Sequence, residues 1–214
     1  MKNTTLAVSI VATLAGLGMS SIASGAVVVI NSRATWDAYV AFHSATVATE
    51  TFESFADGYQ PSATGTAGGT TWTANATGGV FFGDVTVPPD HRVISTNIAN
   101  ATLNFTFAPG VQGIGGEMFG MDSGYGVVLA RITVTLTDGT SYVNDQTSTS
   151  DFVGFYSNGA AIASISVSTS TEGTYATVDN LYFATVPAPG ALALLSLAGV
   201  VGGRSRRRAN SAAV

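Results

Sequence analysis

The sequence contains no cysteine among its 214 residues and only two histidines, His43 and His91. The lack of cysteine excludes a disulfide framework, a thiolate metal site and a cysteine nucleophile. The two histidines have no paired spacing, which excludes a histidine-rich zinc site. The stretch Asp122-Ser123-Gly124 does not form the Gly-x-Ser-x-Gly turn that exposes a serine nucleophile. Without these features, the sequence offers no recognisable nucleophile and base for a hydrolytic triad.

Basic residues are scarce in the middle of the chain. All thirteen acidic residues lie between Asp37 and Asp179, and the stretch of residues 27–185 that contains them has three arginines and no lysine, so its formal charge is −10. A surface of that charge repels nucleic acid and anionic membranes. We therefore expect no nucleic-acid partner, and we expect neutral or cationic ligands or divalent cations to be favoured.

The N-terminal residues follow the order of a secretory signal peptide. Lys2 supplies a positive start, residues 6–19 are mostly apolar and small, and Ser24-Gly25-Ala26 offers small residues before a cut after Ala26. The apolar run is shorter than the roughly 20 residues of a spanning helix. The sequence therefore predicts a signal peptide over residues 1–26 and an exported domain over residues 27–185.

The C-terminal residues combine three features in a fixed order. Two prolines separated by one residue come first, residues 190–203 carry no charge, and a cluster of arginines closes the run. An apolar run stopped by arginines is held in a membrane with its basic end on the cytoplasmic side. The motif residues are Pro187, Ala188, Pro189, Arg204, Arg206, Arg207 and Arg208.

This order resembles the PEP-CTERM sorting tail, in which a Pro-Glu-Pro motif precedes a short hydrophobic helix and an arginine-rich end. The resemblance covers residues 186–208, with Ala188 at the place of the glutamate, and leaves residues 209–214 as a cytoplasmic-side tail. It implies an exosortase-type processing enzyme as a partner, a membrane-anchored precursor held by a C-terminal hydrophobic helix, and a final location at the cell surface or outside the cell. The alternative is an ordinary C-terminal anchor that is never processed.

The middle domain has the pattern of an all-β protein with one short N-terminal helix. Residues 33–42 place Trp36, Tyr39 and Val40 on one helical face. Strands are predicted by alternating β-branched and aromatic residues. Glycine-containing turn signals recur, among them Gly115-Gly116 and Asp138-Gly139. Strands are expected at residues 49–55, 70–74, 101–107, 127–137, 141–143, 151–156, 161–167 and 175–183, with a long loop over residues 58–83. These elements favour an antiparallel jelly-roll-like β-sandwich, flanked by the signal-peptide helix and the C-terminal hydrophobic helix.

Two short patches resemble the end motifs of jelly-roll carbohydrate-binding modules. They are Phe52-Glu53 near the start of the domain and Val178-Asp179-Asn180-Leu181 near its end. In those modules such elements meet at a structural calcium ion. The resemblance implies a calcium site with Glu53 and Asp179 as ligands, since calcium prefers carboxylate and carbonyl oxygens. The alternative is that both acids are simply exposed at strand ends.

Aromatic residues in the domain suggest a surface for sugar rings, because flat rings bury area at a low entropic cost. Trp72 and Tyr125 are the leading candidates, and core filling is the alternative for Trp72. The function indicated is an exported, non-enzymatic surface or matrix protein that is structural, adhesive or polysaccharide-binding. The alternative is a secreted polysaccharide hydrolase, with Glu117 and Asp122 as the nearest paired carboxylates.

Overall fold

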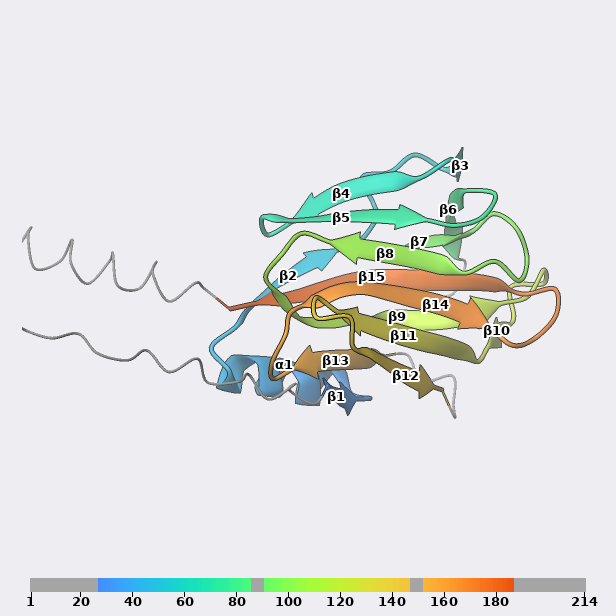
Figure 1. The fold of residues 1–214 in the computed structure, drawn as a ribbon. Helices are drawn as coiled ribbons and strands as arrows, with labels where there is room; N and C mark the ends of the chain where they lie inside the picture. Colours follow the sequence, from blue (N-terminus) through green and yellow to red (C-terminus); the bar gives the residue numbers. More distant parts are fainter. Residues whose placement is uncertain (1–26, 86–90, 147–151, 187–214) are drawn as a thin grey trace, which may run out of the picture.

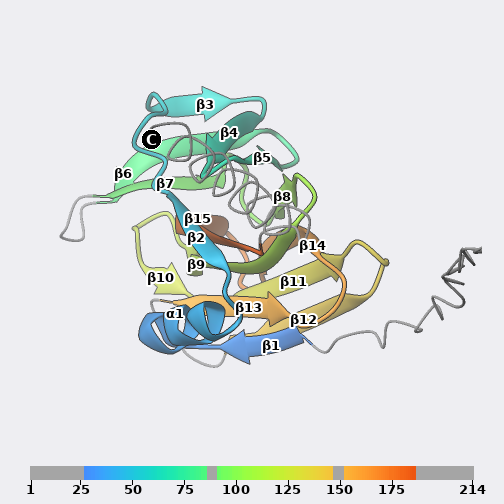
Figure 2. The same cartoon turned by 90° about the vertical axis from the view of Figure 1, so that its left-hand side faces the viewer.

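The structure is a computed structural model that describes residues 27–85, 91–146 and 152–186. These residues form one short helix and two antiparallel sheets of nine and six strands, which pack face to face (Figures 1 and 2). The predicted antiparallel β-sandwich with one N-terminal helix is thereby confirmed. The signal-peptide and sorting residues, including Pro187 and the four tail arginines, lie outside the described residues.

The larger sheet, sheet A, is built around a long central strand pair. Its order is β1 (Val27–Ile30), β13 (Val153–Ser157), β9 (Val111–Met121), β15 (Tyr175–Thr185), β7 (His91–Thr96), β6 (Val80–Val85) and β3 (Gly58–Gln60), with β10 (Val127–Val128) beside β9 and β2 (Thr46–Glu50) beside β15.

The smaller sheet, sheet B, covers one face of sheet A. Its order is β12 (Ser141–Asp145), β11 (Ala130–Leu136), β14 (Ile162–Thr169), β8 (Leu103–Phe107), β5 (Thr70–Asn75) and β4 (Ala63–Ala67).

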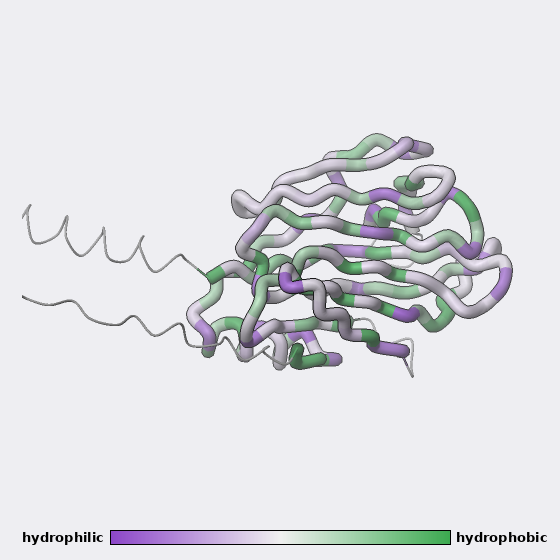
Figure 3. The backbone as a smooth tube through the Cα atoms, viewed as in Figure 1, coloured by the Kyte–Doolittle hydropathy of each residue, from purple (hydrophilic) through white to green (hydrophobic). Residues whose placement is uncertain are grey.

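The main core lies between the two sheets. Along β11, Ile132, Val134 and Leu136 are buried while the threonines between them are half-buried, as expected where alternate side chains point to opposite faces. Hydrophobic and hydrophilic residues alternate in the same way along other strands (Figure 3). The predicted hairpin through Asp138-Gly139 joins β11 to β12, as expected.

The helix α1 (Arg33–Phe42) packs on the outer face of sheet A, the face turned away from sheet B. Trp36 and Val40 are fully buried there, as the helical spacing predicts. Glycines in the sheet make room for the aromatic side chains beneath α1. A Cβ atom on Gly154 would overlap the Trp36 ring, and one on Gly115 would lie 2.7 Å from Phe152 Cζ. The outer face of sheet A therefore carries a second, smaller core beneath α1.

Two predictions about strands and loops are wrong. Residues 58–83 form β3, β4 and β6 where a long loop was expected, on either side of β5, which confirms the strand predicted at residues 70–74. Small residues are required in β4, because a Cβ atom on Gly65 would lie 2.5 Å from the Trp72 ring. Gly115-Gly116 lies inside β9 and is not a turn; a Cβ atom on Gly115 would lie 2.7 Å from the Phe152 ring, and one on Gly116 would lie 2.6 Å from the Asn180 carbonyl oxygen.

The predicted strand over residues 49–55 ends early. The chain leaves β2 after Glu50, whose carboxylate accepts a hydrogen bond from the backbone N–H of Phe52 at 2.9 Å. Phe52 itself has a φ of 61° and a fully buried side chain. The buried phenylalanine thus follows a sharp bend rather than strand alternation. Within the described ranges, no helix is long and apolar enough to cross a membrane.

Candidate functional site

A depression of about 610 Å³ lies on the outer face of sheet A, away from α1. Its floor comes from β6, β7, β9 and β15, where the strand registers place Phe81 opposite Ser95 and Tyr175 opposite Met121. Its volume is within the range of small-ligand sites. We call it the outer-face depression; its lining residues are Asp57, Phe81, Phe82, Gly83, Asp84, Val93, Ser95, Thr96, Asn97, Met121, Asp122, Ser123, Tyr125 and Tyr175.

Aromatic rings at the depression remain accessible. Phe81 is 43% exposed and Tyr125 is 67% exposed, while Tyr175 is half-buried. Tyr125 was one of the two predicted ligand-binding residues, and the structure places it at this depression. Phe81 and Tyr175 were missed by the sequence reasoning, which had assigned Phe81 to a loop.

The turn that carries Tyr125 is held by one carboxylate. Asp122 Oδ1 accepts hydrogen bonds from the backbone N–H groups of Gly124 and Gly126, both at 2.8 Å. The backbone closes the turn further, since the Asp122 N–H donates to the Gly126 carbonyl at 2.9 Å. These bonds allow Tyr125 to adopt a φ of 65°. The Asp122 carboxylate therefore stabilises the turn that carries Tyr125.

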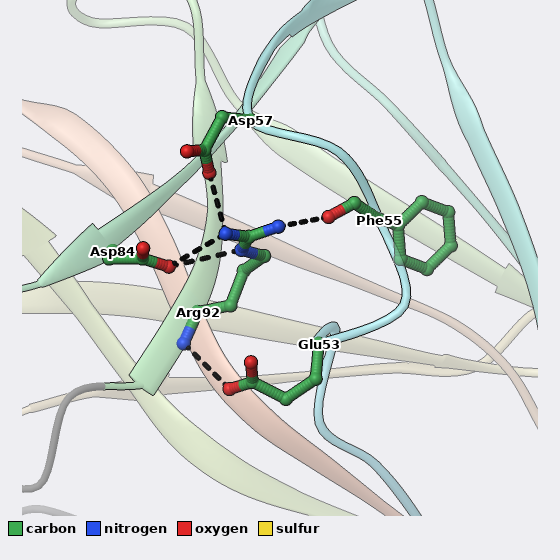
Figure 4. Close-up of polar contacts among 5 residues, drawn as sticks. All are labelled: Glu53, Phe55, Asp57, Asp84 and Arg92. Carbon is green, nitrogen blue, oxygen red and sulfur yellow. Dashed lines mark hydrogen bonds and ion pairs between the residues drawn. The ribbon is translucent and has the colours of Figure 1, made fainter.

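An arginine-centred cluster forms another part of the wall (Figure 4). Arg92 Nη2 lies 2.8 Å from Asp57 Oδ1 and 3.0 Å from Asp84 Oδ1, and Nη1 donates to the Phe55 carbonyl. The hydrogen bond to Asp84 raises the pKa of Arg92, which keeps it charged. Arg92 thus ties the loop after β2 to the β6–β7 hairpin.

The two predicted calcium ligands occupy neighbouring but different surroundings. Glu53 Oε1 accepts a hydrogen bond from the backbone N–H of Arg92 at 3.0 Å, whereas Asp179 lies in β15 opposite Val93 on one side and Glu117 on the other. In the part of the chain that the structure describes, no three histidine, cysteine or acidic side chains group as they would around a metal ion. A calcium ion bound by Glu53 and Asp179 stays a prediction.

Trp72 does not present its ring to solvent. It is 1% exposed, packs against Phe52 and Phe105, and donates from Nε1 to Glu50 Oε2 at 3.0 Å. The prediction of Trp72 as a surface platform is therefore wrong, because the glycine in the adjacent strand β4 opens a core space that the indole fills.

Glu117 is a half-buried strand residue on the outer face of sheet A, directly opposite Asp179. Side chains at such opposed positions lie about 5 Å apart at Cβ. Burial, and then the negative charge of Asp179, raise the pKa of Glu117 from its ordinary value of 4.5 to about 7. Nearby, the Arg33 guanidinium lies 3.6 Å from the centre of the Tyr182 ring and pairs with Asp37. This cluster connects α1 to the central strands and does not line the outer-face depression.

No protein-family model and no curated protein matches this sequence. Among solved structures, the chain is similar to a structure of CsCBM6-3 from Clostridium stercorarium in complex with cellobiose. The sequences are 14% identical, the TM-score is 0.31, and the match covers 64% of this chain and 93% of the other. A similarity of this extent carries no argument about the ligand of this chain.

Replacement of Glu117 by glutamine should flatten the pH dependence of stability. The folded protein binds this proton more tightly than the unfolded chain does, so the free energy of unfolding should fall as the pH rises from about 4.5 to about 7. With partial exposure of the carboxyl, we expect a loss on the order of 1–2 kcal/mol across this window. Urea unfolding at pH values on either side of the window measures it.

Glu172→Gln serves as a control, because this acid is exposed in the turn before β15. It should retain the slope of the unchanged protein. Equal slopes for Glu117→Gln and the unchanged protein would show that the Glu117 carboxyl titrates normally.

Proposed function

We propose that this protein is an exported, non-enzymatic protein of the cell surface or extracellular matrix that binds a neutral polysaccharide in its outer-face depression. The observation that carries the proposal is the depression itself, with accessible aromatic rings beside side chains that form hydrogen bonds. The apolar faces of sugar rings pack against aromatic rings, while carboxylate, amide and hydroxyl groups accept and donate hydrogen bonds to sugar hydroxyls.

The charge of the depression favours an uncharged ligand. Its lining contains Asp57, Asp84 and Asp122 and, in the described residues, no arginine or lysine. The neighbouring Arg92 is bonded to two of these acids, so its charge is balanced within the protein. An acidic polysaccharide would meet carboxylates without a free cation to offset them.

The positions of the carboxylates support binding without hydrolysis. Glu117 and Asp122 are five residues apart along an extended segment, which places their backbones about 16 Å apart. Glycoside hydrolysis uses carboxyl groups about 5 to 10 Å apart. Two other pairs of acids lie closer together: Glu117 and Asp179 do not line the depression, and Asp57 and Asp84, which do line it, both bind Arg92 Nη2.

The route to the surface is proposed from the sequence. A signal peptide over residues 1–26 would direct export. A PEP-CTERM-like tail with Pro187, Ala188 and Pro189 would hold the precursor in the membrane until an exosortase-type enzyme processes it.

Removal of an accessible ring from the depression should weaken glycan binding. We expect Tyr125→Ala and Phe81→Ala each to lose about 1–2 kcal/mol of binding free energy, or roughly tenfold in affinity, because each removes apolar area that packs against the sugar. A glycan array of neutral and uronic-acid oligosaccharides identifies the ligand, and calorimetry measures the affinity. Phe42→Ala is the matched control, since Phe42 is 83% exposed but lies at the end of α1, outside the depression.

Two outcomes would contradict this proposal. One is an equal loss of affinity for Phe42→Ala and Tyr125→Ala. The other is the release of reducing ends from the bound polysaccharide, which would support the hydrolase alternative if Glu117→Gln abolished it.

Processing of the tail can be followed with an epitope tag placed after Val214. We expect the mature surface form to lack the tag, and the double substitution Pro187→Ala and Pro189→Ala to keep the tagged precursor in the membrane fraction. Pro109→Ala, in the turn between β8 and β9, is a control that should be processed normally. A tag that stays on the surface form would favour an ordinary, unprocessed anchor.

A further inference from the structure

Both ends of the described chain lie at the same end of sheet A. The strand registers pair Val27 with Ser157, Tyr156 with Gly113, and Gly113 with Ala184, so the start of β1 and the end of β15 are level across the sheet. Figure 1 shows β15 ending on the left-hand side. We call this side the terminal end of the sandwich.

The surface of the terminal end is almost free of charge. It is formed by the connections at residues 42–45, 68–69, 108–110, 137–140 and 158–161. Among these described residues, Asp138 is the one carboxylate, and no lysine or arginine is present. His43 is the other titratable group, and its ring stacks on Tyr156 at a centroid distance of 4.8 Å. This end therefore differs from the domain as a whole, which carries a formal charge of −10.

A large apolar side chain stands exposed at this end. Phe42, the last residue of α1, is 83% exposed, more than any other large hydrophobic residue that the structure describes. Val186, just past the end of β15, is 43% exposed. Aromatic residues on a surface of low charge are typical of protein parts that contact the headgroup region of a bilayer.

The chain length limits how far this end can stand from a membrane. The apolar run begins at Gly190, so only residues 187–189 separate it from Val186. A fully extended chain advances at most about 3.5 Å per residue, which gives a tether of roughly 15 Å. If the apolar run enters the bilayer, the terminal end must lie next to the headgroups.

We propose that the terminal end seats on the lipid surface of the precursor's membrane, with Phe42 inserted among the headgroups. The proposal rests on the membrane-anchored tail of the proposed function. In this orientation β9 runs away from the membrane surface. The turn that carries Tyr125 lies beyond the opposite end of β9, ten residue steps or about 30 Å away from the membrane. The outer-face depression, which includes Met121, Tyr125 and Tyr175 at this far end, is then held away from the membrane, where polysaccharide is accessible.

Tryptophan substitution with brominated lipids tests this orientation in the full chain. The native Trp36 and Trp72 are buried, so lipid-borne bromine should not reach them. Phe42→Trp and, as the matched control, Tyr125→Trp each add one exposed indole, at opposite ends. Both variants are reconstituted into vesicles of phosphatidylethanolamine and phosphatidylglycerol, with and without brominated phosphatidylcholine.

We expect a loss of fluorescence with brominated lipid in Phe42→Trp that is absent in Tyr125→Trp and in the unchanged protein. A chain that floats with the vesicles but shows no selective quenching overturns the proposal while the anchor stands. A chain that does not float overturns both. A blue-shifted Phe42→Trp emission without vesicles would show that another part of the protein, or a second copy, covers this residue, and it would also overturn the proposal.

Discussion

The pairing of β9 with β15 is the constraint on which the other features of the structure depend. The two strands pair over ten positions in the middle of sheet A, so their register determines how far each neighbouring strand is shifted along the sheet. One face of the pair packs against sheet B, while the other carries the small core beneath α1 and part of the outer-face depression. The same register places Glu117 opposite Asp179 and brings the start of β1 level with the end of β15.

Charge is distributed unevenly between the terminal end and the outer-face depression, which agrees with the proposed position between a membrane and a polysaccharide. The terminal end carries Asp138 alone among the carboxylates of its described connections, whereas Asp57, Asp84 and Asp122 line the depression. The cation beside the depression, Arg92, forms ion pairs with Asp57 and Asp84 and so stabilises its wall. The proposed binding there would depend on rings and hydrogen bonds rather than on net attraction between charges.

The sequence predicted those elements whose two faces differ. Trp36 and Val40 marked the buried face of α1, and Ile132, Val134 and Leu136 marked the core face of β11. The sequence did not predict β9, because side chains on both faces of that strand are largely buried, so hydrophobic and polar residues do not alternate, and because its glycines are typical of turns. The site was only partly predictable: Tyr125 was found as an aromatic candidate, but Phe81 was hidden in a region assigned to a loop. The burial of Trp72 depends on Gly65 in the adjacent strand, and the opposition of Glu117 and Asp179 depends on strand register, which a single sequence does not carry.

The central claim is that the outer-face depression holds the ligand. Nuclear magnetic resonance titration of the domain with the oligosaccharide that it binds most tightly would test this claim directly, because backbone amide shifts report contact residue by residue. The account predicts that the shifts cluster at Phe81, Ser95, Tyr125 and Tyr175, which line the depression. Shifts confined to the outer face of sheet B or to the connections of the terminal end would contradict it.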